Sequence, residues 1–133
     1  MSLEVNLRHI AGVTILELSG RLVAGAEADT LRDRLLDAFE KGEHWILLSF
    51  ENVESVDSAG LGEMVAAYAA LTRRGGTVRL LNVSGHLAHL LARTQLDRLF
   101  DVYDNEAAAL ASFTSAGNTR TQRKLADYLD RDG

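Results

Sequence analysis

The sequence predicts a single α/β domain built on a mixed sheet of four to five strands, with about four helices. Strand-like and helix-like hydrophobic periodicities alternate along residues 1–114. The first two strand-like segments are joined by a short turn and predict an antiparallel hairpin. The run from Trp45 to Phe50 is apolar almost throughout, which is typical of a strand covered on both faces. After the hairpin, alternation of strand and helix implies right-handed crossovers between parallel neighbours.

The hairpin strands are expected at residues 3–8 and 13–19, with a turn over residues 9–12. Leu3, Val5 and Leu7 alternate with polar residues, a period of two that predicts a strand with one buried face. We expect Gly20 to end the second strand and residues 21–25 to form a loop. An apolar stripe then predicts a helix that ends near Gly42, and its members are Ala28, Leu31, Leu35, Ala38 and Phe39.

The second half continues the alternation. The run from Trp45 to Phe50 is expected at the centre of the sheet, and a helix follows that ends at residues 73–76 in two arginines and two glycines. A short strand is expected at residues 77–81, then a helix that Ser84 caps. The last strand is expected at residues 99–103, before a helix with acidic residues in its first turn.

The composition narrows the function classes. The chain has 133 residues, no cysteine and no proline, and its net charge is -5. Without cysteine it forms no disulfide, thiolate metal site or thiol nucleophile, and the negative charge argues against a nucleic-acid partner. Its apolar runs are much shorter than the roughly 20 residues of a membrane span, and no signal-peptide pattern is present. These features predict a cytoplasmic protein that does not bind a membrane.

The most informative stretch is residues 53–65, where a strand-like pattern changes to a helical one. Asp57 or Ser58 is the expected N-cap of that helix. Gly60 and Gly62 both fall in its first turn, although a glycine inside a helix costs roughly 1 kcal/mol relative to alanine. We therefore expect something to approach this turn closely, such as the backbone of a partner. A helix N-terminus favours anions, so the hydroxyl of Ser58 could carry a phosphate, although serine is also a common structural cap.

The sequence V-D-S-A-G-L-G-E-M-V at residues 56–65 resembles the D-S-x-G-L-G motif of STAS domains, the fold of anti-anti-sigma factors, also called anti-sigma factor antagonists. The resemblance covers roughly Leu3 to Thr114, so residues 1–114 are expected to form a STAS-like domain. It implies that Ser58 is the phosphoacceptor. It also implies a partner-binding surface that comprises Asp57, Ala59, Gly60, Leu61, Gly62, Arg21, Leu22 and Val23. Many family members carry aspartate at the positions of Val23 and Ser49.

The same resemblance implies a regulator without enzymatic activity or cofactor. Its partners would be an anti-sigma factor that is also its serine kinase, using Mg-ATP, and a PP2C-like phosphatase. Two alternatives stay open: a non-switching scaffold module, or a sensor that binds a nucleotide or another anion at the Ser58 helix terminus. No metal site is expected, because His86 and His89 lack a third ligand at suitable spacing, and no nucleotide-binding or hydrolase motif is present.

Residues 115–133 form a C-terminal extension outside the resemblance. A linker-like stretch at residues 115–119 precedes a short amphipathic helix with an apolar stripe of Leu125, Tyr128 and Leu129. The extension has four basic and three acidic residues, a net charge of +1, whereas residues 1–114 have ten basic and sixteen acidic residues, a net charge of -6. A basic segment on an acidic domain folds back, exchanges with a neighbour, or frays.

Overall fold

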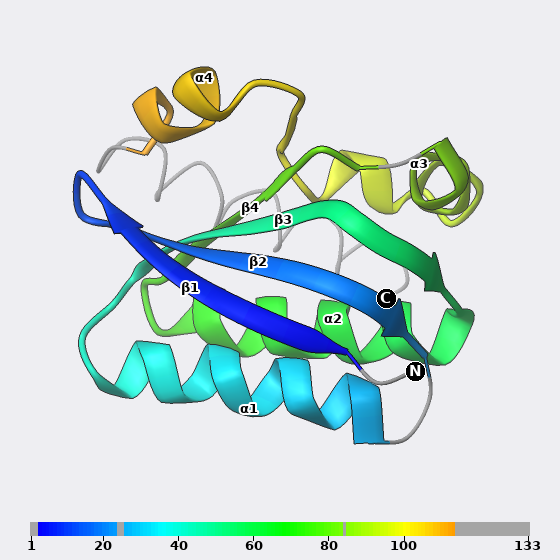
Figure 1. The fold of residues 1–133 in the computed structure, drawn as a ribbon, viewed down its shortest axis with the longest axis horizontal. Coiled ribbons are helices and arrows are strands. Elements are labelled where there is room, and N and C mark those ends of the chain that lie inside the picture. The colour runs from blue at the N-terminus through cyan, green and yellow to red at the C-terminus, as the bar shows by residue number, and fades with distance from the viewer. Residues whose placement is uncertain (1–2, 24–25, 84, 114–133) are drawn as a thin grey trace.

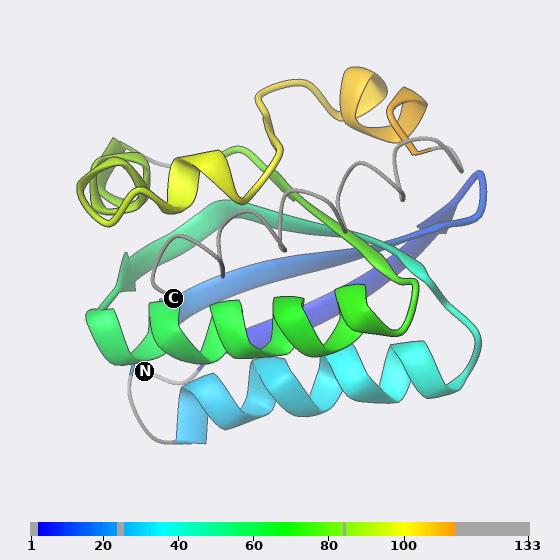
Figure 2. The ribbon, with the colours of Figure 1, turned by 180° about the vertical axis from the view of Figure 1, so that it is seen from behind.

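The computed structural model describes residues 3–23, 26–83 and 85–113. Five strands form one sheet in the order β1-β2-β3-β4-β5. Helices α1 and α2 lie side by side on one face of the sheet, and α4 lies on the other face (Figures 1 and 2). In chain order the elements are β1 (Glu4–Ile10), β2 (Val13–Leu22), α1 (Ala26–Glu40), β3 (Trp45–Val56), α2 (Ser58–Arg73), β4 (Thr77–Leu81), α3 (Gly85–Arg93), a 3₁₀ helix (Leu96–Arg98), β5 (Val102–Tyr103) and α4 (Glu106–Ala111).

The predicted fold class is confirmed. β1 and β2 form an antiparallel hairpin, and β2–β3, β3–β4 and β4–β5 all pair in parallel, with β3 at the centre. The hairpin turn has only two residues, Ala11 and Gly12, both with positive φ (54° and 81°). This geometry matches the right-handed twist of the flanking strands. The C-terminal extension and the proposed Ser84 cap lie outside the described residues.

Five boundary or burial predictions were wrong. β1 runs on to Ile10 instead of ending at Arg8, so the turn is shorter than expected. β2 does not stop at Gly20 but continues to Leu22, because Gly20, at φ 100°, lies beside a register shift that lets pairing with β3 resume. β3 likewise runs on to Val56. The last strand has only the two residues Val102 and Tyr103, since the N–H groups of Leu99 and Phe100 donate to the carbonyl of Leu96 and extend the turn of the 3₁₀ helix at residues 96–98. Leu7 is 42% exposed, because β1 is an edge strand.

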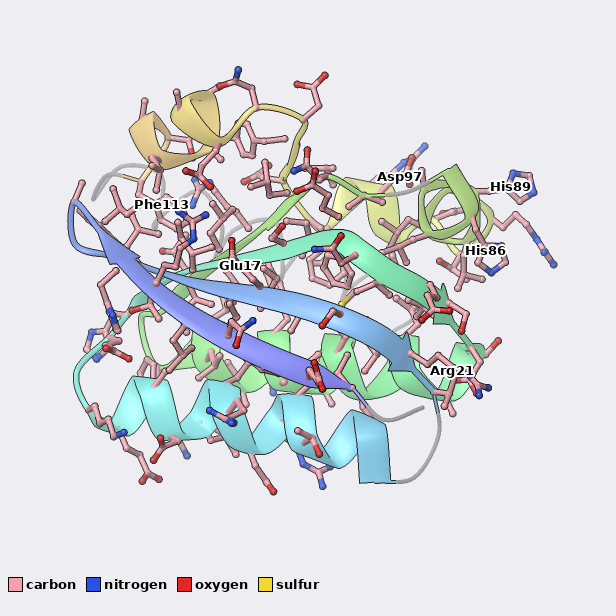
Figure 3. All side chains as sticks on the ribbon, in the orientation of Figure 1. Glu17, Arg21, His86, His89, Asp97 and Phe113 are labelled. Atoms are coloured by element: carbon pink, nitrogen blue, oxygen red, sulfur yellow. The ribbon has the colours of Figure 1, made fainter. Side chains whose placement is uncertain are left out.

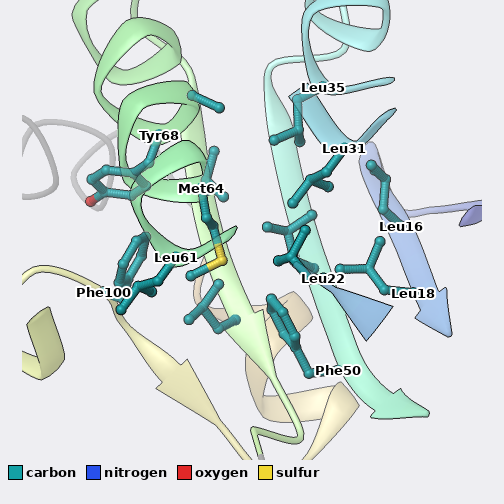
Figure 4. Packing of buried hydrophobic residues seen from close by; sticks show 14 of the residues in the cluster. Leu16, Leu18, Leu22, Leu31, Leu35, Phe50, Leu61, Met64, Tyr68 and Phe100 are labelled. Atoms are coloured by element: carbon teal, nitrogen blue, oxygen red, sulfur yellow. The ribbon is translucent and has the colours of Figure 1, made fainter. Parts of the chain in front are cut away.

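The larger core lies between the sheet and helices α1 and α2 (Figure 4). Leu31 and Leu35 of α1 and Leu61 and Met64 of α2 are each at most 3% exposed. These positions recur at three- and four-residue steps, so each helix turns one apolar stripe to the sheet. Burying a leucine contributes about 1.5–3 kcal/mol, so this stripe fixes where the first turn of α2 sits against the strand ends.

A smaller core lies on the other face, between the sheet and α4, and includes Ile15, Leu47 and Phe113. Arg79 of β4 is fully buried beside it. Its guanidinium lies 4.8 Å from the ring centre of Phe113 and 3.8 Å from a carboxylate oxygen of Asp101. None of its three side-chain nitrogens has a hydrogen-bond partner in the part of the chain that the structure describes. Buried guanidinium groups without hydrogen bonds are costly, so the ion pair with Asp101 is the main compensation.

Tyr68 of α2 belongs to the larger core, and its ionisation provides a test of how tightly that core is packed. It is 2% exposed, its hydroxyl donates to the carbonyl of Leu99 at 3.2 Å, and its ring meets Phe100 edge-on. Burial, followed by the negative charge of Asp101, raises the pKa of Tyr68 well above its ordinary value. The unfolded chain therefore loses this proton first, near pH 10.

The stability contributed by Tyr68 is thus present below pH 10 and is lost as the pH rises further. We expect the unfolding free energy of the wild type to fall, relative to Tyr68→Phe, by about 1.4 kcal/mol per pH unit above pH 10. Urea unfolding of both proteins between pH 8 and 11 measures this difference. Parallel pH profiles would show that Tyr68 ionises equally well in the folded protein.

Candidate functional site

The candidate site lies where β2 and β3 end and α2 begins. Arg21 pairs in register with Ser55, and Leu22 with Val56. The carbonyl of Leu22 also accepts a hydrogen bond from the backbone N–H of Asp57, at 3.2 Å. The end of β2 is thereby joined to the start of α2. The fold brings together the two groups of residues that the sequence singled out, residues 21–23 and residues 57–62.

Asp57 is the N-cap of α2. Its backbone is extended (φ -97°, ψ 176°), and its Oδ1 atom accepts a hydrogen bond from the N–H of Gly60 at 2.7 Å. The carbonyl of Asp57 accepts the first helical hydrogen bond, from the N–H of Leu61 at 2.9 Å. This arrangement satisfies two donors of the first turn and adds a negative charge at the positive end of the helix.

Ser58 is the first residue of α2 and is exposed. Because Asp57 caps the helix, the Ser58 hydroxyl is not needed for capping, and it makes no hydrogen bond within the described part of the chain. The N–H groups of Ser58 and Ala59 come before Leu61, the first residue whose N–H donates a helical hydrogen bond, so they remain available to an anion. The site can therefore present a hydroxyl at a helix terminus that suits a phosphate.

The predicted partner surface divides into exposed and buried residues. Arg21, Asp57, Ala59 and Gly62 are exposed, and Val23 is half-buried. Arg21 lies near the end of β2, on the side of the molecule where α2 begins (Figure 3). A Cβ atom added to Gly62 would meet nothing within 4 Å. Ala59 and Gly62 therefore form a surface with little side-chain bulk beside Ser58.

Three predicted partner contacts need correction. The side chains of Leu22 and Leu61 are 0% and 3% exposed, because they belong to the larger core. Gly60 is buried as well. A Cβ atom at Gly60 would lie 2.3 Å from the carbonyl oxygen of Leu22. The backbone that approaches Gly60 is therefore the chain's own β2 and not that of a partner. Leu22, Gly60 and Leu61 therefore support the exposed surface by packing beneath it in the core.

Sequence reasoning missed an ion pair next to this surface. Arg32 of α1 and Glu63 of α2 pair across the two helices, and both side chains are about 40% exposed. No local motif indicates this pair, because the residues are 31 positions apart. Glu63 directly follows Gly62 in α2, so this ion pair places charged side chains beside the surface that Gly62 leaves open.

The described residues hold no group of three or more histidine, cysteine, aspartate or glutamate side chains suited to bind a metal ion. His86 and His89 point outward from α3 and are exposed (Figure 3). Two shallow hollows lie elsewhere, around β5, and neither is lined by a residue of β2 or α2. Among the described residues, no helix is both long and apolar enough to cross a membrane.

Comparison with known proteins gives the family. The STAS domain matches residues 4–109. The anti-sigma F factor antagonist of Paenibacillus polymyxa is 33% identical over 112 residues, which cover 83% of this chain and 94% of the relative. The anti-sigma-B factor antagonist of Bacillus subtilis is 31% identical over 75 residues, 56% of this chain and 68% of that protein.

The fold comparison agrees with the sequence comparison. The crystal structure of a candidate anti-sigma factor antagonist from Thermotoga maritima superposes with a TM-score of 0.74 at 27% identity, covering 80% of this chain and 92% of that one. Residues 4–109, which the STAS domain matches, include the hairpin, the three parallel pairings and the strand-to-helix turn that carries Ser58. The chain therefore belongs to the STAS domain family, among relatives that are named anti-sigma factor antagonists.

Proposed function

We propose that this chain is an anti-sigma factor antagonist that is switched by phosphorylation of Ser58. Its binding partner would be an anti-sigma factor that also acts as its serine kinase, and a PP2C-like phosphatase would remove the phosphate. The protein would act in the cytoplasm as a regulator without enzymatic activity of its own. The names of its relatives support the first part of this proposal, and the geometry of Ser58 supports the second.

The observation that carries the proposal is that Asp57, and not Ser58, caps α2. Asp57 caps the helix through its 2.7 Å contact with Gly60, which leaves the exposed Ser58 hydroxyl free for chemistry. A kinase can modify this hydroxyl without removing the cap. Because the phosphate would sit at a helix N-terminus, the folded domain should tolerate it.

Electrostatics explains how a phosphate there would end binding. A phosphoserine adds about -1.5 to -2 charges next to the carboxylate of Asp57. A partner carboxylate about 6 Å away, at an effective dielectric constant of 40 to 80, would be repelled by roughly 1.5 to 3 kcal/mol. This corresponds to about a ten- to hundredfold loss of affinity. Among the described residues of the predicted partner surface, Arg21 is the exposed cation that can offset part of the added charge, while the nearby Arg32 is paired with Glu63.

We expect the cognate anti-sigma factor and Mg-ATP to place one phosphate on the protein, at Ser58. Ser58→Ala should abolish the modification and still bind the partner, because Asp57 keeps the cap. Ser55→Ala is the matched control, since Ser55 lies three residues earlier on β3 and is half-buried. Mass spectrometry of the three proteins locates the phosphate. Modification at Thr30 or Ser84, or binding without any modification, would contradict the switch and favour the scaffold alternative.

A further inference from the structure

Two shallow hollows lie around β5, at the edge of the sheet. They adjoin each other, because Val83, Val102 and Tyr103 line both. Val102 is 44% exposed. We call this surface the acidic groove, because its remaining lining includes the carboxylates of Glu51, Asp97, Asp101 and Asp104.

The charge of the acidic groove is one-sided. Of the described residues that line it, none is a lysine, arginine or histidine. Asp101 has the buried Arg79 as its ion-pair partner, at 3.8 Å. Glu51, Asp97 and Asp104 are exposed and form no ion pair with the described residues. Three uncompensated carboxylates around an apolar floor favour an occupant that is both basic and apolar.

The backbone of β5 adds a second binding feature. The carbonyls of Asp101 and Tyr103 accept hydrogen bonds from the N–H groups of Leu80 (3.0 Å) and Asn82 (2.8 Å) of β4. In a parallel pair the residue between them directs its own N–H and C=O the other way, so those of Val102 face outward at the sheet edge. Natural proteins usually cover or charge such an edge.

The chain itself contains a segment with complementary chemistry. Residues 120–129, which lie outside the described residues, include three basic residues, Arg120, Arg123 and Lys124, and one acidic residue, Asp127. Leu125 and Tyr128 supply apolar side chains directly after them. The basic and apolar residues thus occur together, as the groove requires.

The segment is also long enough to reach the groove. α4 starts two residues after Asp104, which lies at the rim of the acidic groove. Its six residues rise about 9 Å, so Phe113 lies roughly 12 Å from Asp104. The five linker residues 115–119 extend to about 17 Å. Arg120 can therefore return to the carboxylates. A tether of this length gives an effective concentration in the millimolar range, which favours this segment over a separate partner.

We propose that residues 120–129 of this chain bind intramolecularly in the acidic groove, with their basic side chains on Asp97, Asp104 and Glu51 and their apolar side chains on Val102 and Tyr103. The contact is distinct from the Ser58 surface and does not depend on the proposed switch. It covers the edge of β5 and is weakened by salt, because the carboxylates are exposed.

The absence of native cysteine allows a direct test in the full-length chain. Cysteines are placed in the pairs Val102→Cys with Ala126→Cys and Leu7→Cys with Ala126→Cys. Leu7 is the matched control, because it is 42% exposed on β1, at the opposite edge of the sheet. Intramolecular disulfide formation in glutathione buffer measures the effective concentration of the two thiols.

At 50 mM NaCl we expect this effective concentration to be at least tenfold higher for the Val102 pair than for the Leu7 pair. It should fall severalfold in 0.5 M NaCl, and also when Arg120, Arg123 and Lys124 are changed to glutamine. Equal values for the two pairs, or no effect of the glutamine changes, would overturn the proposal. Disulfide-linked dimers as the main product would also overturn it, because they would place the segment of a second copy in the groove.

A second measurement avoids any change in the groove. In the ¹⁵N-labelled full-length chain, the three glutamine changes alone should shift the amide signals of Val83, Val102 and Tyr103 and leave that of Leu7 in place. Unchanged signals around β5 would contradict the proposal even if a cysteine variant failed to fold.

Discussion

Gly60→Ala is expected to destabilise the domain by roughly 2–4 kcal/mol. The added Cβ would lie 2.3 Å from the carbonyl oxygen of Leu22 and 2.9 Å from its carbonyl carbon. Both atoms belong to the backbone of β2, which is held by the pairing of Leu22 with Val56 and by the hydrogen bond from Asp57. The clash therefore cannot be relieved by a side-chain rotation, and either α2 or β2 has to move.

Gly62→Ala is the matched control in the same helical turn. Its Cβ meets nothing within 4 Å, and its φ is not positive, so alanine should stabilise α2 by about 0.5–1 kcal/mol. Urea denaturation of both variants and the wild type gives the two differences. If both variants changed stability equally, close packing of β2 against α2 would not explain why residue 60 is a glycine.

Asp101→Asn is expected to cost about 3 kcal/mol, because it leaves the charge of the fully buried Arg79 without its ion-pair partner. Arg79→Met should cost little or even stabilise the domain. It removes three buried nitrogens that have no hydrogen bonds, and the sulfur of methionine can replace the cation on the Phe113 ring. Adding Arg79→Met to Asp101→Asn should recover most of the loss.

Thermal or urea unfolding of the two single variants and the double variant measures these effects. A larger loss for Arg79→Met than for Asp101→Asn would show that the guanidinium stabilises the smaller core, mainly through Phe113. The unfolding cooperativity of each variant serves as the control, since an altered dependence on urea would indicate a changed denatured state.

The sequence predicted the elements that have strong periodicity. α2 and its glycine-rich C-terminal end, the short β4 and the central place of β3 all followed from hydrophobic patterns and local end signals. It also indicated that something approaches the first turn of α2 closely, which we expected to be the backbone of a partner. The sequence could not show that β2 of the same chain takes this place, because the contact between Gly60 and Leu22 depends on the register of β2 and β3.

Other features depend on long-range pairing and left no local signal. Gly20 appeared to end a strand, yet a bulge carries β2 on to Leu22. Arg79 lies in a strand whose other residues are threonine, valine and leucine, and nothing nearby in sequence predicts its burial against Phe113 and Asp101. The acidic groove likewise gathers Glu51 from β3, Asp97 from the 3₁₀ helix and Asp104 from the segment after β5.

The most direct test of the central claim is the affinity of the anti-sigma factor for this protein before and after stoichiometric phosphorylation of Ser58. Isothermal titration calorimetry on both forms, with circular dichroism to show that the phosphorylated domain stays folded, gives the comparison. We predict that phosphorylation weakens binding about ten- to hundredfold while the fold is retained. Equal affinities of the two forms, with Ser58 fully phosphorylated, would contradict the account.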